Sequence, residues 1–264
     1  MKSPLKYIGG KAKLINNKSI VFPQDFNDYY EPFCGGLSPF LNLISNNKVS
    51  FLSDNSENLI NFYSVVKYRI NELITELETN PYFINTKTNY ILCRKIYNEI
   101  KILEQPIQKA ALFLFLNKTG FNGMYRENKK GEYNIPFGKM KSPNWCDKIT
   151  LFYLHKKLNS DNVYLTCQDY SKINPKKNDL VYLDPPYYNT FSGYSKNTFG
   201  KQKHLDLFLK CIEWKSLGIH VILSNSDDPF ILELYKDFEI IKIPINYSIN
   251  PKCKNSKFEL LIKF

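Results

Sequence analysis

The feature that most constrains the fold is a series of short apolar runs separated by longer segments with helical periodicity. The runs are YYEPF at 29–33, KVSFL at 48–52, NVYLT at 162–166, DLVYL at 179–183, HVILS at 220–224, FEIIKI at 238–243 and FELLIKF at 258–264. Apolar runs of this length are typical of buried strands. Helical patterns at 201–217 and 228–236 lie between the later runs. Because strands that alternate with helices build layered sheets, we predict an α/β fold with a doubly wound, mostly parallel sheet.

The region from about 56 to 145 departs from this alternation. Its helical patterns cover 57–79, 88–103 and the strongly apolar segment IQKAALFLFL at 107–116. Two strand-like pieces, 121–126 and 132–137, then flank a polar Lys-Lys-Gly turn, which predicts a β-hairpin with a loop longer than two residues. We therefore expect a helical module that ends in a hairpin, inserted between the second and third strands. The expected boundaries are 57–145 for the module and 1–56 with 146–264 for the sheet domain.

Composition narrows the kind of partner. The 264 residues include 36 Lys and Arg against 25 Asp and Glu, a formal net charge of +11. A surface this basic indicates an anionic partner, nucleic acid first, with a Lys/Asn/Ile-rich genome bias as the alternative. The six cysteines include no Cys-x-x-Cys pair, so we expect a reduced, cytoplasmic chain without a zinc site or disulfide framework. No apolar run reaches the ~18 residues of a membrane span, and the first residues have no signal-peptide pattern.

A glycine turn marks the first candidate site. In EPFCGGLSPFLNLI at 31–44, a short strand runs into Gly35-Gly36 and then into a helix. Glycines at such a turn let a ligand approach the backbone closely. The next strand ends in Asp54, where an acid can bind both hydroxyls of a ribose, so the pair indicates a nucleoside-containing cofactor. A plain turn is the alternative reading of the glycines. They do not form G-x-G-x-x-G, and YIGGK at 7–11 lacks the spacing of a phosphate loop.

The second candidate site is LVYLDPPYY at 180–188. Two prolines stiffen the strand end, and their carbonyls lie beside the Asp184 carboxylate, so this patch is rich in hydrogen-bond acceptors. Such a patch suits an exocyclic NH₂ group, and Tyr187 offers a flat face on which a base can stack. Acceptors that draw on the N–H hydrogens free the nitrogen lone pair to attack an electrophile. The alternative is a strand-end turn that is merely rich in proline.

Together these motifs resemble the Dam-like DNA adenine-N6 methyltransferases, the DPPY-type family that uses S-adenosylmethionine, in its GATC-reading branch. The resemblance rests on LKYIGGK at 5–11, EPFCGG at 31–36, Asp54, FNGMYR…GEYNIPFGK within 121–139, DPPY at 184–187, ILSNSD at 222–227 and FELLI at 258–262. The set in this order is highly specific. It implies a Rossmann-like methyltransferase fold and methyl transfer to N6 of adenine in double-stranded DNA, within GATC, by base flipping. It implies no metal, and S-adenosylhomocysteine as the second product.

The resemblance also implies roles for single residues. Those implied for the target adenine are Asp184, Pro185, Pro186 and Tyr187. Those implied for the cofactor are Tyr7, Lys11, Glu31, Phe33, Gly35, Gly36, Asp54, Asp169, Tyr170 and Asp184. Of these, Lys11 is expected at the methionine carboxylate, Asp54 at the ribose hydroxyls, and the Asp169-Tyr170 pair around the cofactor adenine. Tyr7 stands where many relatives have Trp.

The inserted module resembles the family's target-recognition region. The residues implied for DNA binding are Lys6, Phe121, Asn122, Met124, Arg126 and Pro136. Phe121 is expected to enter the base stack when the adenine leaves it, and Lys6 to read the first guanine. Arg126 suits a bidentate contact with a guanine, with a phosphate contact as the alternative. Met124 and Pro136 are apolar and suit a thymine methyl group.

Several features stay outside these sites. His155, His204 and His220 stand alone and are expected to be surface or packing residues. Lys252, Lys254 and Lys257 are either a DNA-facing loop or a solvated charge run. A restriction endonuclease with the same site is a further expected partner, without a stable complex.

Three rival functions stay open at the level of sequence. One is an amino-methyltransferase for cytosine N4 or for another DNA sequence, and another is a DNA-binding relative without catalysis. The third is a protein- or RNA-directed methyltransferase, which is disfavoured because such enzymes usually have Asn where this chain has Asp184.

Overall fold

The structure is a computed structural model that describes residues 2–7, 10–11, 14–15, 19–45, 47–128, 130–160, 162–188, 199–245 and 257–264. Its strands are β1 (Tyr29–Glu31), β2 (Ser50–Asp54), β3 (Val163–Cys167), β4 (Leu180–Leu183), β5 (His220–Ser226), β6 (Glu239–Ile245) and β7 (Lys257–Lys263). Its α-helices are α2 (Ser38–Leu43), α3 (Glu57–Tyr68), α4 (Ile70–Thr79), α5 (Lys87–Glu99), α6 (Pro106–Thr119), α7 (Lys148–Leu158), α8 (Lys201–Ser216) and α9 (Pro229–Leu234). Two short 3-10 turns are η1 (Phe121–Gly123) and η2 (Tyr170–Lys172).

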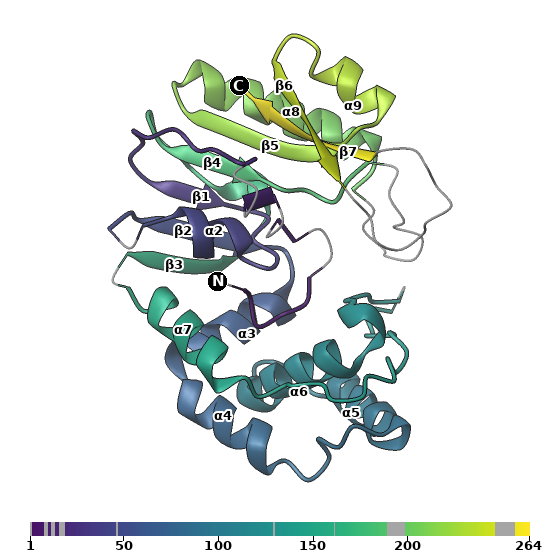
Figure 1. Ribbon diagram of the computed structural model, residues 1–264. Helices are drawn as coiled ribbons and strands as arrows, with labels where there is room; N and C mark the ends of the chain where they lie inside the picture. Colours follow the sequence, from purple (N-terminus) through teal and green to yellow (C-terminus); the bar gives the residue numbers. More distant parts are fainter. Residues whose placement is uncertain are drawn as a thin grey trace.

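All seven predicted strands lie in one sheet of the described residues, in the order β3-β2-β1-β4-β5-β7-β6 (Figure 1). Strands β1 to β5 run parallel to one another, and β7 is antiparallel to both of its neighbours, β5 and β6. The prediction of an α/β fold with a mostly parallel sheet is confirmed. Because β7 runs in the opposite direction, its first residues lie at the edge where β5 ends.

The central strand β4 shows why the apolar runs that form the strands are hydrophobic on both faces. Leu180 and Tyr182 join a core with residues of α2, α3 and α6. Val181 and Leu183 point the other way and join a second core with residues of α8 and α9. A strand covered on both faces has no polar side, so its sequence is continuously hydrophobic. The helices therefore cover both faces of the sheet.

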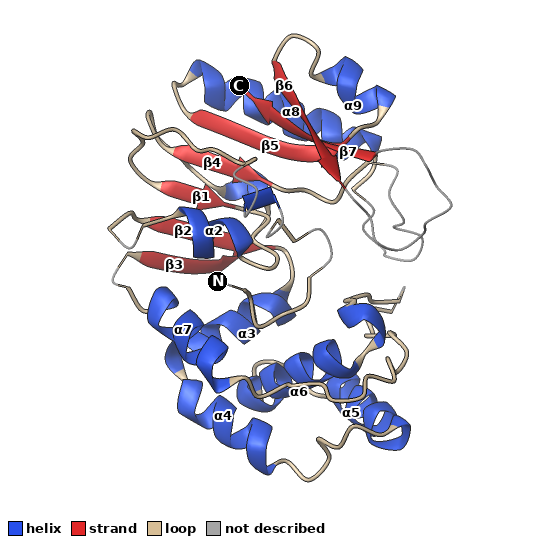
Figure 2. Cartoon of the chain, viewed as in Figure 1, coloured by secondary structure: helices blue, strands red, loops and turns tan. Residues whose placement is uncertain are grey.

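The region between β2 and β3 is helical, and in Figure 2 it lies beside the β3 edge of the sheet. The apolar helix α6 is its centre, since each residue from 110 to 116 is at most 3% exposed. The predicted helix over 57–79 is two helices, because the backbone of Arg69 (φ −135°, ψ 37°) leaves the helical region. The predicted helix over 88–103 ends at Glu99, since Ile100 is extended. No helix in the described part of the chain is long and apolar enough to cross a membrane.

The predicted hairpin over 121–126 and 132–137 is only partly correct. Its two halves run antiparallel, but within the described residues they meet at two isolated bridges, Gly120 with Phe137 and Glu127 with Tyr133. The first half begins as the 3-10 turn η1 rather than as a strand.

The second half lacks a ladder because its backbone is paired elsewhere. The Tyr90 hydroxyl donates to the Ile135 carbonyl at 2.8 Å, and Asn98 both donates to the Tyr133 carbonyl and accepts from its amide. These donors and acceptors come from α5, so helix side chains replace a partner strand. We call residues 120–138 the recognition arm, after the predicted DNA-binding residues that they contain.

Candidate active site

The glycine turn and the predicted ribose-binding acid meet at the carboxyl edge of the sheet. Gly35 follows β1 and Asp54 ends β2, and these two strands are parallel neighbours. The Gly35 amide donates to Asp54 Oδ2 at 3.1 Å, and the Ser56 amide donates to Oδ1 at 3.0 Å. Burial raises the pKa of Asp54, against the effect of these amides. Asp54 as a residue is nevertheless only half-buried, so a ligand can approach it.

The glycine turn is shaped by Tyr7. Gly35 has φ of +41°, and a Cβ on it would lie 2.9 Å from the Tyr7 ring. A Cβ on Gly36 would lie 3.1 Å from Tyr7 Cβ. The Tyr63 hydroxyl fixes the turn from below by donating to the Gly35 carbonyl at 2.5 Å. The glycines are therefore required by backbone conformation and by the close approach of a side chain.

Asp169 follows β3, two residues after Cys167, which is the partner of Asp54 in the parallel pair of β2 and β3. The Asn55 side chain donates to Asp169 Oδ2 at 3.0 Å. Burial alone would raise the pKa of Asp169, but hydrogen bonds from Asn55 and Ser171 hold it below its usual value. Asp54 and Asp169 thus lie at the carboxyl ends of two neighbouring strands.

Phe33 and Tyr170 provide an aromatic surface at the same edge. Their rings stack with centroids 5.4 Å apart. Glu31 is less accessible: it is 1% exposed and accepts hydrogen bonds from the Tyr29 hydroxyl at 2.7 Å and the Phe40 amide at 3.2 Å. Phe40 lies in the first turn of α2, so Glu31 holds the start of that helix.

The DPPY segment directly follows β4, and a cluster of charged groups surrounds it. Lys11 Nζ lies 2.7 Å from Asp184 Oδ2 and 3.2 Å from Glu259 Oε1. The Tyr187 hydroxyl donates to the same Glu259 oxygen. Lys11 Nζ also lies 5.0 Å from the centroid of the Tyr187 ring. One ammonium thus joins the predicted catalytic acid to an acid that the sequence analysis did not select.

Burial controls the charges of this cluster. Lys11 is 2% exposed and the Asp184 side chain 20% exposed. Burial raises the pKa of Asp184, Lys11 lowers it and Glu259 raises it further. Burial would lower the pKa of Lys11, but the two carboxylates raise it above its usual value. Lys11 is therefore a firmly charged ammonium beside an acid whose ionised form is disfavoured by its surroundings.

Lys6 meets the recognition arm through a side chain on α6. The Asn117 side chain accepts from the Lys6 amide at 2.8 Å and donates to the Lys6 carbonyl at 2.8 Å. It also donates to the Gly123 carbonyl at 3.0 Å. The structure thus brings Lys6 together with the predicted recognition residues, although more than a hundred residues separate them in the sequence.

The arm presents the other predicted DNA-binding residues. Phe121 and Pro136 are exposed and joined by a backbone hydrogen bond of 2.9 Å. Asn122 is exposed with φ of +54°. Met124 is half-buried against the core, and Arg126 Nε donates to Asn134 at 2.8 Å. The six residues lie on one arm and on the segment tied to it.

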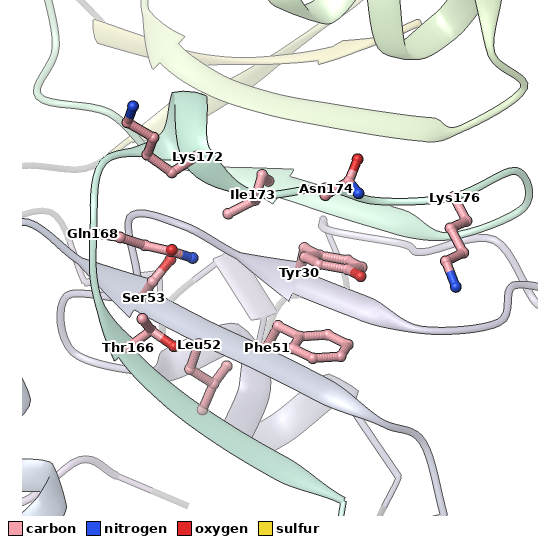
Figure 3. A pocket seen from close by; sticks show the side chains of 10 residues that line it. All are labelled: Tyr30, Phe51, Leu52, Ser53, Thr166, Gln168, Lys172, Ile173, Asn174 and Lys176. Carbon is pink, nitrogen blue, oxygen red and sulfur yellow. The ribbon is translucent and has the colours of Figure 1, made fainter.

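A hollow of about 340 Å³ lies on the face of β1 to β3 (Figure 3). It is lined by Tyr30, Phe51, Leu52, Ser53, Thr166, Gln168, Lys172, Ile173, Asn174 and Lys176. Ser53 and Gln168 directly precede Asp54 and Asp169 in the sequence. Two residues that line the hollow are thus the sequence neighbours of predicted cofactor-binding acids, and none of the predicted site residues lines it.

The histidines have packing roles. His204 is fully buried, His155 Nδ1 contacts the Val66 carbonyl at 2.8 Å, and His220 Nε2 contacts Asn178 at 3.0 Å. No group of three or more His, Cys, Asp or Glu side chains in the described ranges is placed to hold a metal ion. Lys252 and Lys254 lie outside the described residues, as does the side chain of Lys257.

Sequence reasoning missed Glu259 and Asn117. Glu259 is the one polar residue in the segment FELLI, Asn117 directly follows the apolar run AALFLFL at 110–116, and each is buried. A buried polar side chain needs a partner, so this pattern was the available signal. It could not name the partner, because both contacts join residues far apart in the chain.

Comparison with known proteins decides the family. A family model described as D12 class N6 adenine-specific DNA methyltransferase matches residues 7–249. The chain belongs to this family. It is an adenine-specific DNA methyltransferase, and the family implies S-adenosylmethionine as methyl donor and DNA as substrate. The cytosine, protein and RNA alternatives are thus not supported.

Relatives match along almost the whole chain. A Haemophilus influenzae protein named DNA adenine methylase is 33% identical over 275 residues, which cover 98% of this chain and 92% of its own length. The type II methyltransferase M1.LlaDCHI of Lactococcus lactis is 32% identical over 246 residues (90% and 86%). The type II methyltransferase M.MjaIII of Methanocaldococcus jannaschii is 32% identical over 288 residues (99% and 98%). The relatives of this D12 enzyme thus include a protein named DNA adenine methylase and proteins named type II methyltransferases.

Proposed function

We propose that this D12 enzyme methylates N6 of adenine within GATC in duplex DNA, and that it does so on a base rotated out of the helix. The observation that carries the proposal is that the acceptor-rich DPPY segment and the glycine turn lie at one edge of the sheet. In addition, Asn117 ties the recognition arm to the N-terminal segment. The helices on both faces of the sheet support a doubly wound methyltransferase fold.

The residues at the edge fit S-adenosylmethionine. Asp54 is a half-buried residue whose carboxylate suits ribose hydroxyls, and Asp169 is a second carboxylate suited to an adenine amine. Phe33 beside Tyr170 offers an apolar face for the purine. Lys11 is proposed for the methionine carboxylate. The cofactor supplies a methyl group activated on a sulfonium. The protein supplies alignment, which accounts for much of the rate in a reaction between two bound partners.

The DPPY segment is proposed to hold the target adenine. Asp184 and the proline carbonyls accept the hydrogens of N6, which withdraws the nitrogen lone pair from the ring. The same acceptors stabilise the positive charge that develops on N6 as the methyl group arrives. Stacking on Tyr187 contributes ~1–3 kcal/mol, by analogy with other contacts between bases and aromatic rings.

The recognition arm is proposed to select the site. Extracting a base from the duplex costs a few kcal/mol, and insertion of the exposed Phe121 offsets part of this. Arg126 is proposed to read a guanine bidentately, and Lys6 to read the first guanine. Asn122, Met124 and Pro136 are proposed to face base edges. We further propose residues 57–145 as the target-recognition module within the sheet domain.

Two duplexes that differ only in GATC against GTAC test the proposal. The enzyme and labelled S-adenosylmethionine are incubated with each, and the modified base is identified by mass. N6-methyladenine on the GATC duplex alone is the expected result. Transfer to both duplexes would contradict the proposed reading of the arm while leaving the DPPY site intact.

A cognate restriction endonuclease is a second proposal, supported by relatives named as type II methyltransferases. The test is protection of methylated DNA from a GATC-cutting nuclease encoded beside this gene. Failure to find or protect against such a nuclease would favour a solitary enzyme.

A further inference from the structure

Glu259 lies where β7 places it against the DPPY segment. It pairs with Ser226, the last residue of β5, and is 7% exposed. Because β7 is antiparallel to β5, the third residue of β7 sits at the carboxyl edge of the parallel strands. A carboxylate buried at this depth is unfavourable unless charged or hydrogen-bonding groups surround it. We therefore expect the contacts of Glu259 to have a functional role.

Both contacts of Glu259 lead to the site. Its Oε1 accepts the hydrogen of the Tyr187 hydroxyl and lies 3.2 Å from Lys11 Nζ. Lys11 Nζ lies 2.7 Å from the other carboxylate, Asp184 Oδ2. A ring held by its hydroxyl has a fixed plane. An ammonium held by two carboxylates keeps one of them when the other takes a new partner.

We propose that Glu259 is a positioning residue for the target adenine: it fixes the plane of the Tyr187 ring and holds the Lys11 ammonium while Asp184 accepts the N6 hydrogens. This inference rests on the proposed function, since it assumes that the adenine stacks on Tyr187. Glu259 does not touch the base; it acts through Tyr187 and Lys11. Its charge also acts on Asp184 across the shared ammonium.

The charge predicts a pH signature. The ionisable groups that act on or are coupled to Asp184 are Lys11, Glu259, Tyr187, Tyr182, Glu31 and Tyr7. Burial is the main reason that the pKa of Asp184 is raised, Lys11 opposes it, and the negative charge of Glu259 adds to it. Glu259→Gln removes that charge and weakens the competition of residue 259 with Asp184 for the Lys11 ammonium. Both changes lower the pKa of Asp184, so its ionised form persists to lower pH.

The test is the single-turnover rate of adenine methylation as a function of pH, for the wild type and Glu259→Gln. In the variant the acidic limb is expected to move to lower pH, and the plateau rate to fall by about 10- to 100-fold, since misplacement by ~1 Å can cost about 10²-fold. A lower plateau with an unmoved limb would reduce Glu259 to a structural role and overturn the proposal. An unchanged plateau would overturn it as well.

Glu239→Gln is the matched control. Glu239 is an exposed acid on β6 that pairs with Lys263, near the other end of β7. This change should leave both the limb and the plateau as in the wild type. If the wild type itself forms no N6-methyladenine, the proposed function fails and not the role of Glu259.

Tyr187→Phe keeps the inference testable if Glu259→Gln does not fold. It removes the hydroxyl that Glu259 holds and retains the ring. We expect a lower plateau rate with DNA affinity retained. A plateau equal to that of the wild type would show that the hydroxyl contact positions nothing.

Discussion

At the scale of single residues, Glu31 shows how burial sets a charge in this enzyme. Its carboxyl group is 1% exposed, and burial raises its pKa from 4.5 to about 8. Between these pH values the folded chain keeps a proton that the unfolded chain has lost. The unfolded state then binds fewer protons, so the free energy of unfolding falls as the pH rises through this window.

Glu31→Gln should remove this dependence. Glutamine has the size of a protonated glutamate and can still accept from Tyr29, so the fold should persist. The wild type is expected to lose up to about 1.4 kcal/mol of stability per pH unit from this group, and the variant none of it. Urea unfolding at several pH values between 4.5 and 8 measures the difference. Parallel curves for the two proteins would contradict the raised pKa.

At the scale of elements, the N-terminal segment and the recognition arm are packed through a glycine. Gly123 has φ of +63°, and a Cβ on it would lie 2.4 Å from Lys6 Cβ and Cδ. Gly131, at the tip of the arm, has φ of +81° and no atom within 4 Å of its Cβ position. The two glycines therefore share a backbone conformation and differ in their neighbours.

Gly123→Ala should displace Lys6, while Gly131→Ala should not. Both variants carry the strain of a left-handed residue, about 1–2 kcal/mol. Only Gly123→Ala should also lower kcat/KM on GATC relative to sequences with another first base. Steady-state methylation of a set of duplexes measures this. An equal effect of both substitutions would mean that the Lys6 contact has no part in recognition.

Arg126→Ala tests the arm itself. Arg126 is held by Asn134 across the arm, which fixes the guanidinium before DNA binds. The loss of a bidentate guanine contact should relax discrimination at one base pair by roughly 1–3 kcal/mol. Competition between duplexes altered at each position of the site measures it. A uniform loss of affinity on every sequence would make Arg126 a phosphate contact instead.

At the scale of the whole molecule, local patterns in the sequence predicted the features that depend on neighbouring residues: the strands, the glycine turn and the acid at the end of β2. The seven apolar runs are strands because burial on one or both faces selects such residues wherever the strand lies. The glycine turn and Asp54 were placed correctly because parallel strands bring their ends to one edge. The break at Arg69 was missed, since neither Gly nor Pro marks it.

Contacts between segments that are distant in the chain could not be predicted from the sequence. The arm has no continuous ladder because Tyr90 and Asn98 of α5 take up its backbone groups. Glu259 reaches the site only because β7 lies antiparallel between β5 and β6. Neither fact follows from periodicity, since each depends on which elements become neighbours after folding.

The central claim is that adenine is methylated at the DPPY segment, where Asp184 accepts the N6 hydrogens. The most direct test is N6-methyladenine formed by Asp184→Ala in a single turnover, with DNA affinity measured on the same preparation. The account predicts a loss of rate of roughly 10²-fold or more, since the group stabilises developing charge, with DNA affinity largely retained. A variant that forms N6-methyladenine at nearly the wild-type rate would contradict it.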